Sequence, residues 1–195
     1  DIYLSYMVVG ERKLERLVWL SGRLDSFATT VDGPGNVLPL ARAAESHGET
    51  VDAILSLRPT DPFDAHLRLK GLMALLAHPD ADVLIGANKR IANILRKAED
   101  TVPDSYDQAA FTEAAERELA EAFAGVEPRA RQAAGQGRYA ESLLALAELR
   151  PAVDRFFDQV MVMADDAAVR RNRLALLATL HRAFCAVADL ARLPG

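Results

Sequence analysis

The stretch Asp166–Arg192, DAAVRRNRLALLATLHRAFCAVADLAR, decides the fold class of this chain. Its apolar side chains recur every three or four residues, at Leu177, Leu180, Phe184, Val187 and Ala191. This spacing puts them on one face of an α-helix, because each helical residue advances by about 100°. The stretch therefore predicts a long amphipathic helix from about Asp166 to Arg192 that buries this face.

The rest of the sequence repeats this helical spacing between short breaks. The breaks contain proline or glycine, at Arg58–Pro62, His78–Asp80, Asp100–Asp104 and Gly135–Gly137. Alanine, a strong helix former, is the commonest residue with 35 copies, and runs of strand-favouring residues are scarce. The sequence predicts an all-α protein, a multi-helix array of roughly eight helices with short connections.

Composition narrows the class of protein further. With 195 residues, half of them hydrophobic, the chain can bury a sizeable core. The net charge of -5 excludes a globally cationic nucleic-acid coat but not a local basic face. A single cysteine excludes a disulfide framework and a cysteine-based zinc site. The apolar run Ile2–Val9 is too short to span a bilayer, so we expect a cytoplasmic protein.

The sequence contains no recognisable catalytic centre. None of its histidines has a histidine or cysteine partner at metal-ligand spacing: His47, His66, His78 and His181. The segment Gly33–Gly35 lacks the lysine and hydroxyl of a phosphate-binding loop. Cys185 falls in the apolar part of the final helix, and we interpret it as a small buried hydrophobe rather than a nucleophile. We therefore expect a chain that binds a partner and performs no chemistry of its own.

A basic face is the first candidate binding site. The stretch Gly86–Lys97, GANKRIANILRK, contains four cations and no acid. On a helix, its polar side chains fall within about a third of the circumference: Lys89, Arg90, Asn93, Arg96 and Lys97. This face suits contacts with the phosphates and sugars of a nucleic acid. The structural alternative is a solvated face whose cations pair with acids on neighbouring helices.

The second candidate is the arginine group at the start of the final helix. Arg170 and Arg171 either contact RNA or form structural pairs, and the sequence does not decide between these roles. Arg173 falls on the apolar face and needs a carboxylate, because an unpaired buried charge is costly. We expect Asp166 or Asp158 to pair with Arg173.

Two further expectations concern the residues that precede this helix. We expect Asp165 and Asp166 to supply the N-cap and the first-turn acid, rather than a catalytic carboxylate pair. Met161 and Met163 are interpreted as core-filling residues.

These stretches resemble the beta subunit of bacterial glycyl-tRNA synthetase. That family has a Pro-Val-Asp-x-Phe-Phe-Asp-x-Val-Met-Val-Met segment followed by Asp-Asp and Arg-x-Asn-Arg-Leu. The corresponding residues here are Pro151–Met163, with Ala152 inserted after the proline, Asp165–Asp166 and Arg170–Leu174. Three more segments are similar to the family, Val51–Thr60, Ala87–Leu95 and Val187–Leu193. The resemblance runs from about Thr50 to the C-terminus, and residues 1–48 show no family motif.

The resemblance implies an array that ends in an anticodon-binding-type helical bundle, similar to that of arginyl-tRNA synthetase. It implies a helical body segment at 1–82 and an anticodon-binding helical domain at 83–195. The implied partners are glycine tRNA and an alpha subunit, in an assembly of two alpha and two beta chains. ATP and magnesium are expected in the alpha subunit and no cofactor in this chain, which would be the C-terminal part of a longer beta subunit. The residues expected to contact tRNA are Lys89, Arg90, Asn93, Arg96, Arg170 and Arg171.

Two rival functions are weighed against tRNA binding. The chain could be an assembly module that docks onto the alpha subunit or onto the rest of the beta subunit. Co-purification with the alpha chain in the absence of tRNA would favour this function. An independent enzyme would require turnover by the isolated chain, which no residue set in the sequence supports.

Overall fold

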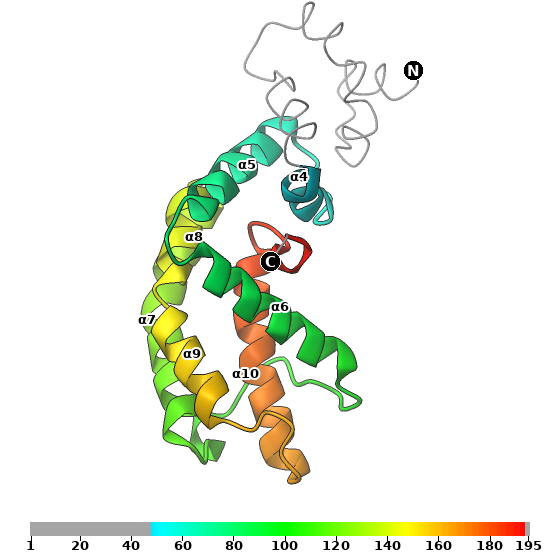
Figure 1. Ribbon diagram of the computed structural model, residues 1–195, viewed down its shortest axis with the longest axis vertical. Coiled ribbons are helices and arrows are strands. Elements are labelled where there is room, and N and C mark those ends of the chain that lie inside the picture. The colour runs from blue at the N-terminus through cyan, green and yellow to red at the C-terminus, as the bar shows by residue number, and fades with distance from the viewer. Residues whose placement is uncertain (1–47, 194–195) are drawn as a thin grey trace, which may run out of the picture.

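The computed structural model describes residues 48–193, and this part of the chain is all-α, as the sequence predicts (Figure 1). It contains no strand among these residues. The helices are α4 (Gly48–Leu55), α5 (Pro62–Leu76), α6 (Ala81–Lys97), α7 (Ala114–Gly135), α8 (Tyr139–Ala147), α9 (Arg150–Gln159) and α10 (Ala167–Cys185). Two short 3-10 helices complete the set, η2 (Gln108–Ala110) and η3 (Leu190–Arg192). The predicted breaks all fall between helices or at their ends.

The longest helix, α7, is covered along one side by α8 and α9. A turn at Gly135–Gly137 separates α7 from α8, and Gly137 has a positive φ of 71° that favours glycine. The shared core contains Leu119, Phe123, Leu143 and Phe156, each at most 5% exposed. This layer forms one wall of the molecule, and α10 and α6 lie beside it (Figure 1).

The final helix buries its predicted stripe but ends earlier than expected. Leu177, Leu180 and Phe184 are at most 3% exposed, yet α10 stops at Cys185 rather than near Arg192. The guanidinium of Arg68 on α5 donates hydrogen bonds to the carbonyl oxygens of Ala186 (2.8 Å) and Val187 (3.0 Å). These two carbonyl oxygens accept from Arg68 instead of from the backbone N–H groups of a further helical turn. The helix therefore ends here, and the chain turns and forms η3.

Helices α5 and α8 approach each other closely at Gly71. A Cβ atom on Gly71 would lie 2.6 Å from Cβ of Tyr139, so only glycine fits there. The Tyr139 hydroxyl donates to the carboxylate of Asp64, and Arg68 lies 4.6 Å from the centre of the Tyr139 ring. Burial and this hydrogen bond raise the pKa of Tyr139 to about 12, so the phenol stays protonated. The contact joins α5, near the start of the described residues, to α8, which lies later in the chain.

The short helix α4 packs against η3 near the C-terminus. The backbone N–H of Asp189 donates to the carbonyl of Ala53 at 2.9 Å, and Val51 and Ile54 are fully buried. Contacts of α4 and α5 with later helices thus cross the predicted boundary near residue 83, and the division into 1–82 and 83–195 stays a prediction. Residues 1–47, which include His47 and Gly33–Gly35 and all but the last residue of the segment without a recognised family motif, lie outside the described part.

Candidate nucleic-acid interface

Helix α6 presents its cations on the face opposite its buried side. The buried side consists of Ala81, Leu84, Ile85, Asn88 and Ile91. The opposite face exposes Arg90, Asn93, Arg96 and Lys97, with Lys89 half-buried at its edge. None of the four cations forms an ion pair with any residue that the structure describes. The described contacts therefore do not support the alternative in which acids on neighbouring helices neutralise the basic face.

Two side chains on this face are held in place by neutral partners. The Arg90 guanidinium lies 4.2 Å from the centre of the Phe157 ring of α9, a cation–π contact. Arg96 donates to the Oδ1 atom of Asn93 at 2.8 Å. Both contacts leave the positive charge uncompensated, which suits an anionic ligand. Whether these residues contact tRNA stays a prediction.

The arginines at the start of α10 divide into different roles. Arg170 forms an ion pair with Asp100 (2.5 Å) and donates to the carbonyl oxygen of Ala164 (2.7 Å). The Arg170 hydrogen bond is the main reason that the pKa of Asp100 is lowered. Arg170 thus ties the start of α10 to the segment after α6, which is a structural role. Arg171 is exposed and has no ion-pair partner among residues 48–193.

Arg173 is buried and paired, as expected, but its predicted partner is wrong. It is 4% exposed, and its Nε atom lies 2.9 Å from Oε1 of Glu116 on α7, which is 1% exposed. Asp166 instead caps α10 by accepting from the backbone N–H groups of Ala168 and Val169. Asp166 lies two helical turns from Arg173, about 10 Å along the axis, so it is too far to pair. Of the N-cap and first-turn acid expected from Asp165 and Asp166, the N-cap is confirmed at Asp166, but the first turn of α10 contains no acid. The predicted ion pair of Asp166 with Arg173 is wrong, as is the alternative pair with Asp158.

The interpretation of Met161 and Met163 as core residues is also wrong. Their side chains are 74% and 49% exposed, while Val160 and Val162, which alternate with them, are 6% and 7% exposed. The helical period that governs α10 does not extend into this loop, where alternate residues point inward and outward. The alternating Val-Met-Val-Met order was the signal in the sequence that indicated a non-helical segment with an exposed side.

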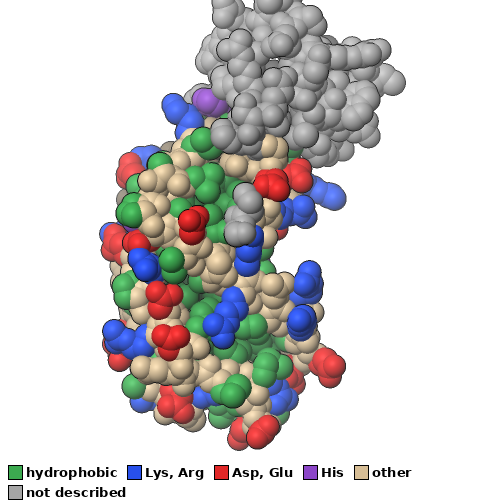
Figure 2. All heavy atoms as spheres, in the orientation of Figure 1, with side chains coloured by type: hydrophobic (Ala, Val, Ile, Leu, Met, Phe, Trp, Pro, Cys, Tyr) green, Lys and Arg blue, Asp and Glu red, His purple; other side chains and the backbone are tan. Residues whose placement is uncertain are grey.

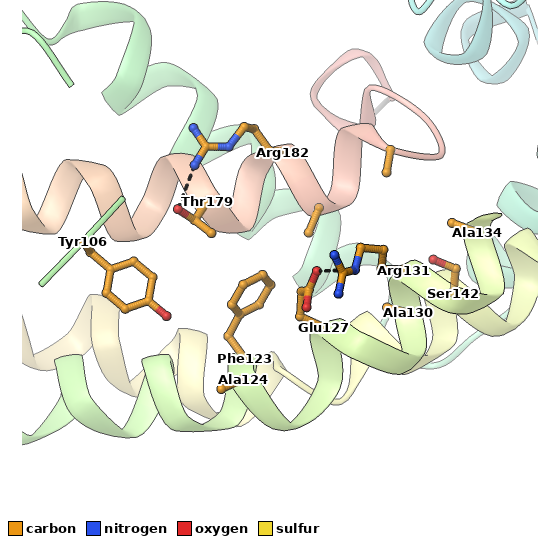
Figure 3. Close-up of a pocket in the computed structure, with 12 residues that line it drawn as sticks. Tyr106, Phe123, Ala124, Glu127, Ala130, Arg131, Ala134, Ser142, Thr179 and Arg182 are labelled. Atoms are coloured by element: carbon orange, nitrogen blue, oxygen red, sulfur yellow. Dashed lines mark hydrogen bonds and ion pairs between the residues drawn. The ribbon is translucent and has the colours of Figure 1, made fainter. Parts of the chain in front are cut away.

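An open groove of about 530 Å³ lies between α7 and α10 (Figure 3). Alanine is the commonest residue in its lining, and the rings of Tyr106 and Phe123 also face it. Arg131 pairs with Glu127 at 3.1 Å, and Arg182 donates to the Thr179 hydroxyl at 2.9 Å. Sequence reasoning missed this groove, because its walls come from segments far apart in the chain.

Cys185 is half-buried rather than fully buried, and it lies beside His181, one helical turn earlier. The prediction that no histidine has a cysteine at such a spacing is therefore wrong for this pair. The Cys185 sulfur is 3.6 Å from Nε2 of His181, whose Nδ1 atom is 3.1 Å from Oδ1 of Asn88. Burial, and secondarily the charge of Asp189, raises the pKa of the Cys185 thiol to about 11. Burial also lowers the pKa of His181, so no imidazolium is available to stabilise a thiolate. These contacts agree with a structural cysteine.

We expect Cys185 to be alkylated slowly in the folded chain. At pH 8, iodoacetamide should react with it at least about tenfold more slowly than in urea, where the thiol regains a pKa near 8.5. Because the chain has one cysteine, mass spectrometry of the intact protein measures this rate directly. Equal rates in the folded and unfolded chain would contradict the assignment.

Residues 48–193 hold no group of three or more histidine, cysteine, aspartate or glutamate side chains placed to bind a metal ion. None of the helices described is both long and apolar enough to span a membrane.

The described residues form an all-α array in which helix α6 carries a basic face without ion-pair partners. The family profile of the DALR anticodon binding domain matches residues 84–190, more than half of the chain. The chain therefore belongs to the DALR anticodon-binding domain family.

Curated relatives agree with the resemblance read from the sequence. The chain is 53% identical over 183 residues to a glycine–tRNA ligase beta subunit of Leptothrix cholodnii, covering 89% of this chain and 26% of that protein. It is 53% identical over 143 residues to the beta subunit of Thiobacillus denitrificans, covering 73% and 20%. It is 48% identical over 145 residues to that of Methylobacillus flagellatus, covering 74% and 20%. The chain spans about a quarter or less of the length of these relatives. The predicted family resemblance is confirmed, and it extends further than predicted, because a match that covers 89% of the chain includes part of residues 1–48, where the sequence showed no family motif.

Proposed function

We propose that this chain is the tRNA-binding module of a bacterial glycine–tRNA ligase beta subunit, and that it binds the anticodon region of glycine tRNA. Family membership and the names of the relatives support this function. The observation that carries it is the α6 face, where Lys89, Arg90, Arg96 and Lys97 have no carboxylate partner among the described residues. Phosphates would supply the missing negative charge.

The proposal places the chemistry of aminoacylation in another chain. The alpha subunit would bind ATP, magnesium and glycine, in an assembly of two alpha and two beta chains in the cytoplasm. The side chains of the present chain would hold the tRNA by its phosphates and bases. This division of labour agrees with the absence of a catalytic motif in the sequence.

A binding titration tests the proposal. The 195-residue chain is titrated with glycine tRNA and with the same tRNA carrying a changed anticodon, at several salt concentrations. We expect tighter binding of the unchanged tRNA and an affinity that falls steeply with salt, because phosphate contacts release counterions. Equal binding of both tRNAs would contradict recognition of the anticodon.

The double substitution Lys89→Ala/Arg90→Ala is expected to weaken tRNA binding by about tenfold. Two lost phosphate contacts should also reduce the slope of log affinity against log salt by about 1.5. Both side chains lie outside the buried side of α6, so the thermal unfolding midpoint should fall by no more than about 2–4 °C, through loss of the Arg90–Phe157 contact.

A matched variant, Arg129→Ala/Arg138→Ala, removes the same charge from exposed pairs with Glu148 and Glu141. It should bind tRNA nearly as well as the unsubstituted chain. If both double variants lose affinity equally, the net charge and not the α6 face determines binding.

Assembly is the second candidate function, and the groove between α7 and α10 favours it. The small alanine side chains in its lining would leave room for the side chains of a helix from another protein chain. Co-purification of this chain with the alpha subunit in the absence of tRNA would support this function.

A further inference from the structure

The loop between α9 and α10 carries the two most exposed large apolar side chains among the described residues. Met161 is 74% exposed and Met163 is 49% exposed, whereas the next, Met73, is 38% exposed. Their neighbours Val160 and Val162 are buried and anchor the loop in the core. Exposed apolar side chains that lie close together are typical of interaction sites.

Two arginines fix the backbone of this loop. Arg173 donates to the carbonyl oxygen of Met161 at 2.8 Å, and Arg170 donates to that of Ala164 at 2.7 Å. Each arginine is itself held by a carboxylate, Arg173 by Glu116 and Arg170 by Asp100. A fixed backbone lowers the entropy cost of binding, because only the methionine side chains remain to be ordered.

Apolar and cationic side chains lie on one face of the molecule around the loop. Figure 2 shows the face on which α6 lies in front. Apolar side chains gather in the lower part of this face, and basic side chains lie along α6. The Arg90 guanidinium over the Phe157 ring connects α6 to α9, which leads directly into the loop. The basic helix is therefore in contact with the helix that leads into the methionine loop.

We propose that Met161 and Met163 contact the unstacked bases of a single-stranded RNA loop whose phosphates lie on α6. The inference rests on the proposed function and names the part of the chain that contacts bases. Sequence-specific recognition of RNA targets unpaired bases, whose flat faces stack on protein side chains such as aromatic rings. Methionine is among the apolar residues that insert between bases, and its flexible thioether adapts to their shape.

The cations of α6, which have no carboxylate partners in the part of the chain described, favour RNA over a protein partner on this face. Exposed acids flank the loop itself, at Asp158, Asp165 and Asp166, so the phosphates would lie on α6 and only the bases would reach the methionines. Single-stranded nucleic acids are bound by combining such a cationic track with side chains on which bases stack. A protein partner would need its own acidic surface beside an apolar one, and the experiment below includes that outcome.

The test separates contacts with bases from contacts with the backbone. The full chain is titrated with an RNA hairpin that carries the anticodon stem and loop of glycine tRNA. A second hairpin has the same stem and abasic nucleotides in the loop, so that the phosphates remain and the bases are absent. We expect the unsubstituted chain to bind the first hairpin about tenfold more tightly than the second.

The substitution Met161→Ala/Met163→Ala is expected to remove this difference. It should weaken binding of the complete hairpin by about tenfold and leave binding of the abasic hairpin unchanged. Met161→Leu/Met163→Leu, which keeps the apolar bulk, should retain most of the affinity. Met73→Ala removes an exposed methionine from α5 and should affect neither hairpin.

Each remaining outcome counts against the inference. If the double alanine variant binds both hairpins like the unsubstituted chain, the loop does not contact bases, and association with the alpha subunit then tests a protein partner. If it loses affinity for both hairpins equally, the loop contributes to backbone binding only. If the unsubstituted chain binds neither hairpin, the proposed function itself fails and the inference fails with it.

Discussion

Replacing Glu116 with alanine is expected to lower the free energy of unfolding by about 3–5 kcal/mol. The substitution leaves the Arg173 guanidinium, which is 4% exposed, without its carboxylate inside the protein. Glu116 also accepts hydrogen bonds from the backbone N–H groups of Thr112 (2.9 Å) and Glu113 (2.7 Å) at the start of α7. The variant therefore loses an ion pair and a helix cap together, and urea denaturation measures the cost.

The matched control is Glu118→Ala on the same helix. Glu118 forms an exposed ion pair with Arg155, so its loss should cost less than about 1 kcal/mol. The double substitution Glu116→Leu/Arg173→Met removes both charges and should be less destabilised than Glu116→Ala, because no unpaired charge remains buried. If Glu116→Ala and Glu118→Ala have equal effects, the buried pair is not a major source of stability.

The ion pair between Glu116 and Arg173 makes the free energy of unfolding depend on pH. Burial opposes the ionisation of Glu116, but hydrogen bonds from Arg173, Glu113 and Thr112 outweigh it and lower the pKa. Since the folded-state pKa lies below the unfolded value near 4.3, the stabilisation is present above that pH and is lost as the pH falls through the folded-state pKa. The difference in unfolding free energy between the unsubstituted chain and Glu116→Gln should thus be constant near neutral pH and shrink in acid. A difference that grows in acid would contradict this sign.

Replacing Gly71 with alanine is expected to destabilise the chain by about 2–3 kcal/mol, although alanine is the better helix former. The new Cβ would lie 2.6 Å from Cβ of Tyr139 and 2.8–2.9 Å from backbone atoms of Tyr139 and Ala140. Backbone atoms of α8 cannot move aside as a flexible side chain can, so α5 and α8 would have to separate. Urea or thermal denaturation checks the prediction.

Gly86→Ala is the control and should have the opposite sign. A Cβ on Gly86 meets no atom within 4 Å, and the residue is exposed in the interior of α6. The substitution should therefore stabilise the chain by up to about 1 kcal/mol through helix propensity alone. Stabilisation by Gly71→Ala as well would show that α5 and α8 do not pack as closely as described.

The buried ion pair connects stability to the proposed recognition loop. Arg173 contacts Glu116 in the core and the carbonyl oxygen of Met161 at the surface. A variant that releases Arg173 would therefore disturb the loop even where the chain remains folded. Binding studies on Glu116 variants need a parallel measurement of stability for this reason.

Patterns within a few residues of sequence predicted which segments are helical and which of their side chains are buried or exposed. The spacing of apolar residues in α6 placed Leu84 and Ile91 inside and Arg90 and Arg96 outside, as the structure has them. The N-cap of α10 at Asp166 was equally readable, because a cap is a contact between neighbours in sequence. The methionine loop was misread because a helical period was carried into a segment that is not helical.

The sequence by itself determined an all-α chain, its breaks, a basic face on α6 and the need of Arg173 for a carboxylate. All of these follow from interactions within a few residues, or from the cost of burying a charge wherever it lies. Only the tertiary structure decided that the carboxylate is Glu116, 57 residues away, that Arg68 ends α10, and that the methionines face outward. These outcomes depend on which helices meet, and that is set by the packing of the whole core rather than by any local pattern.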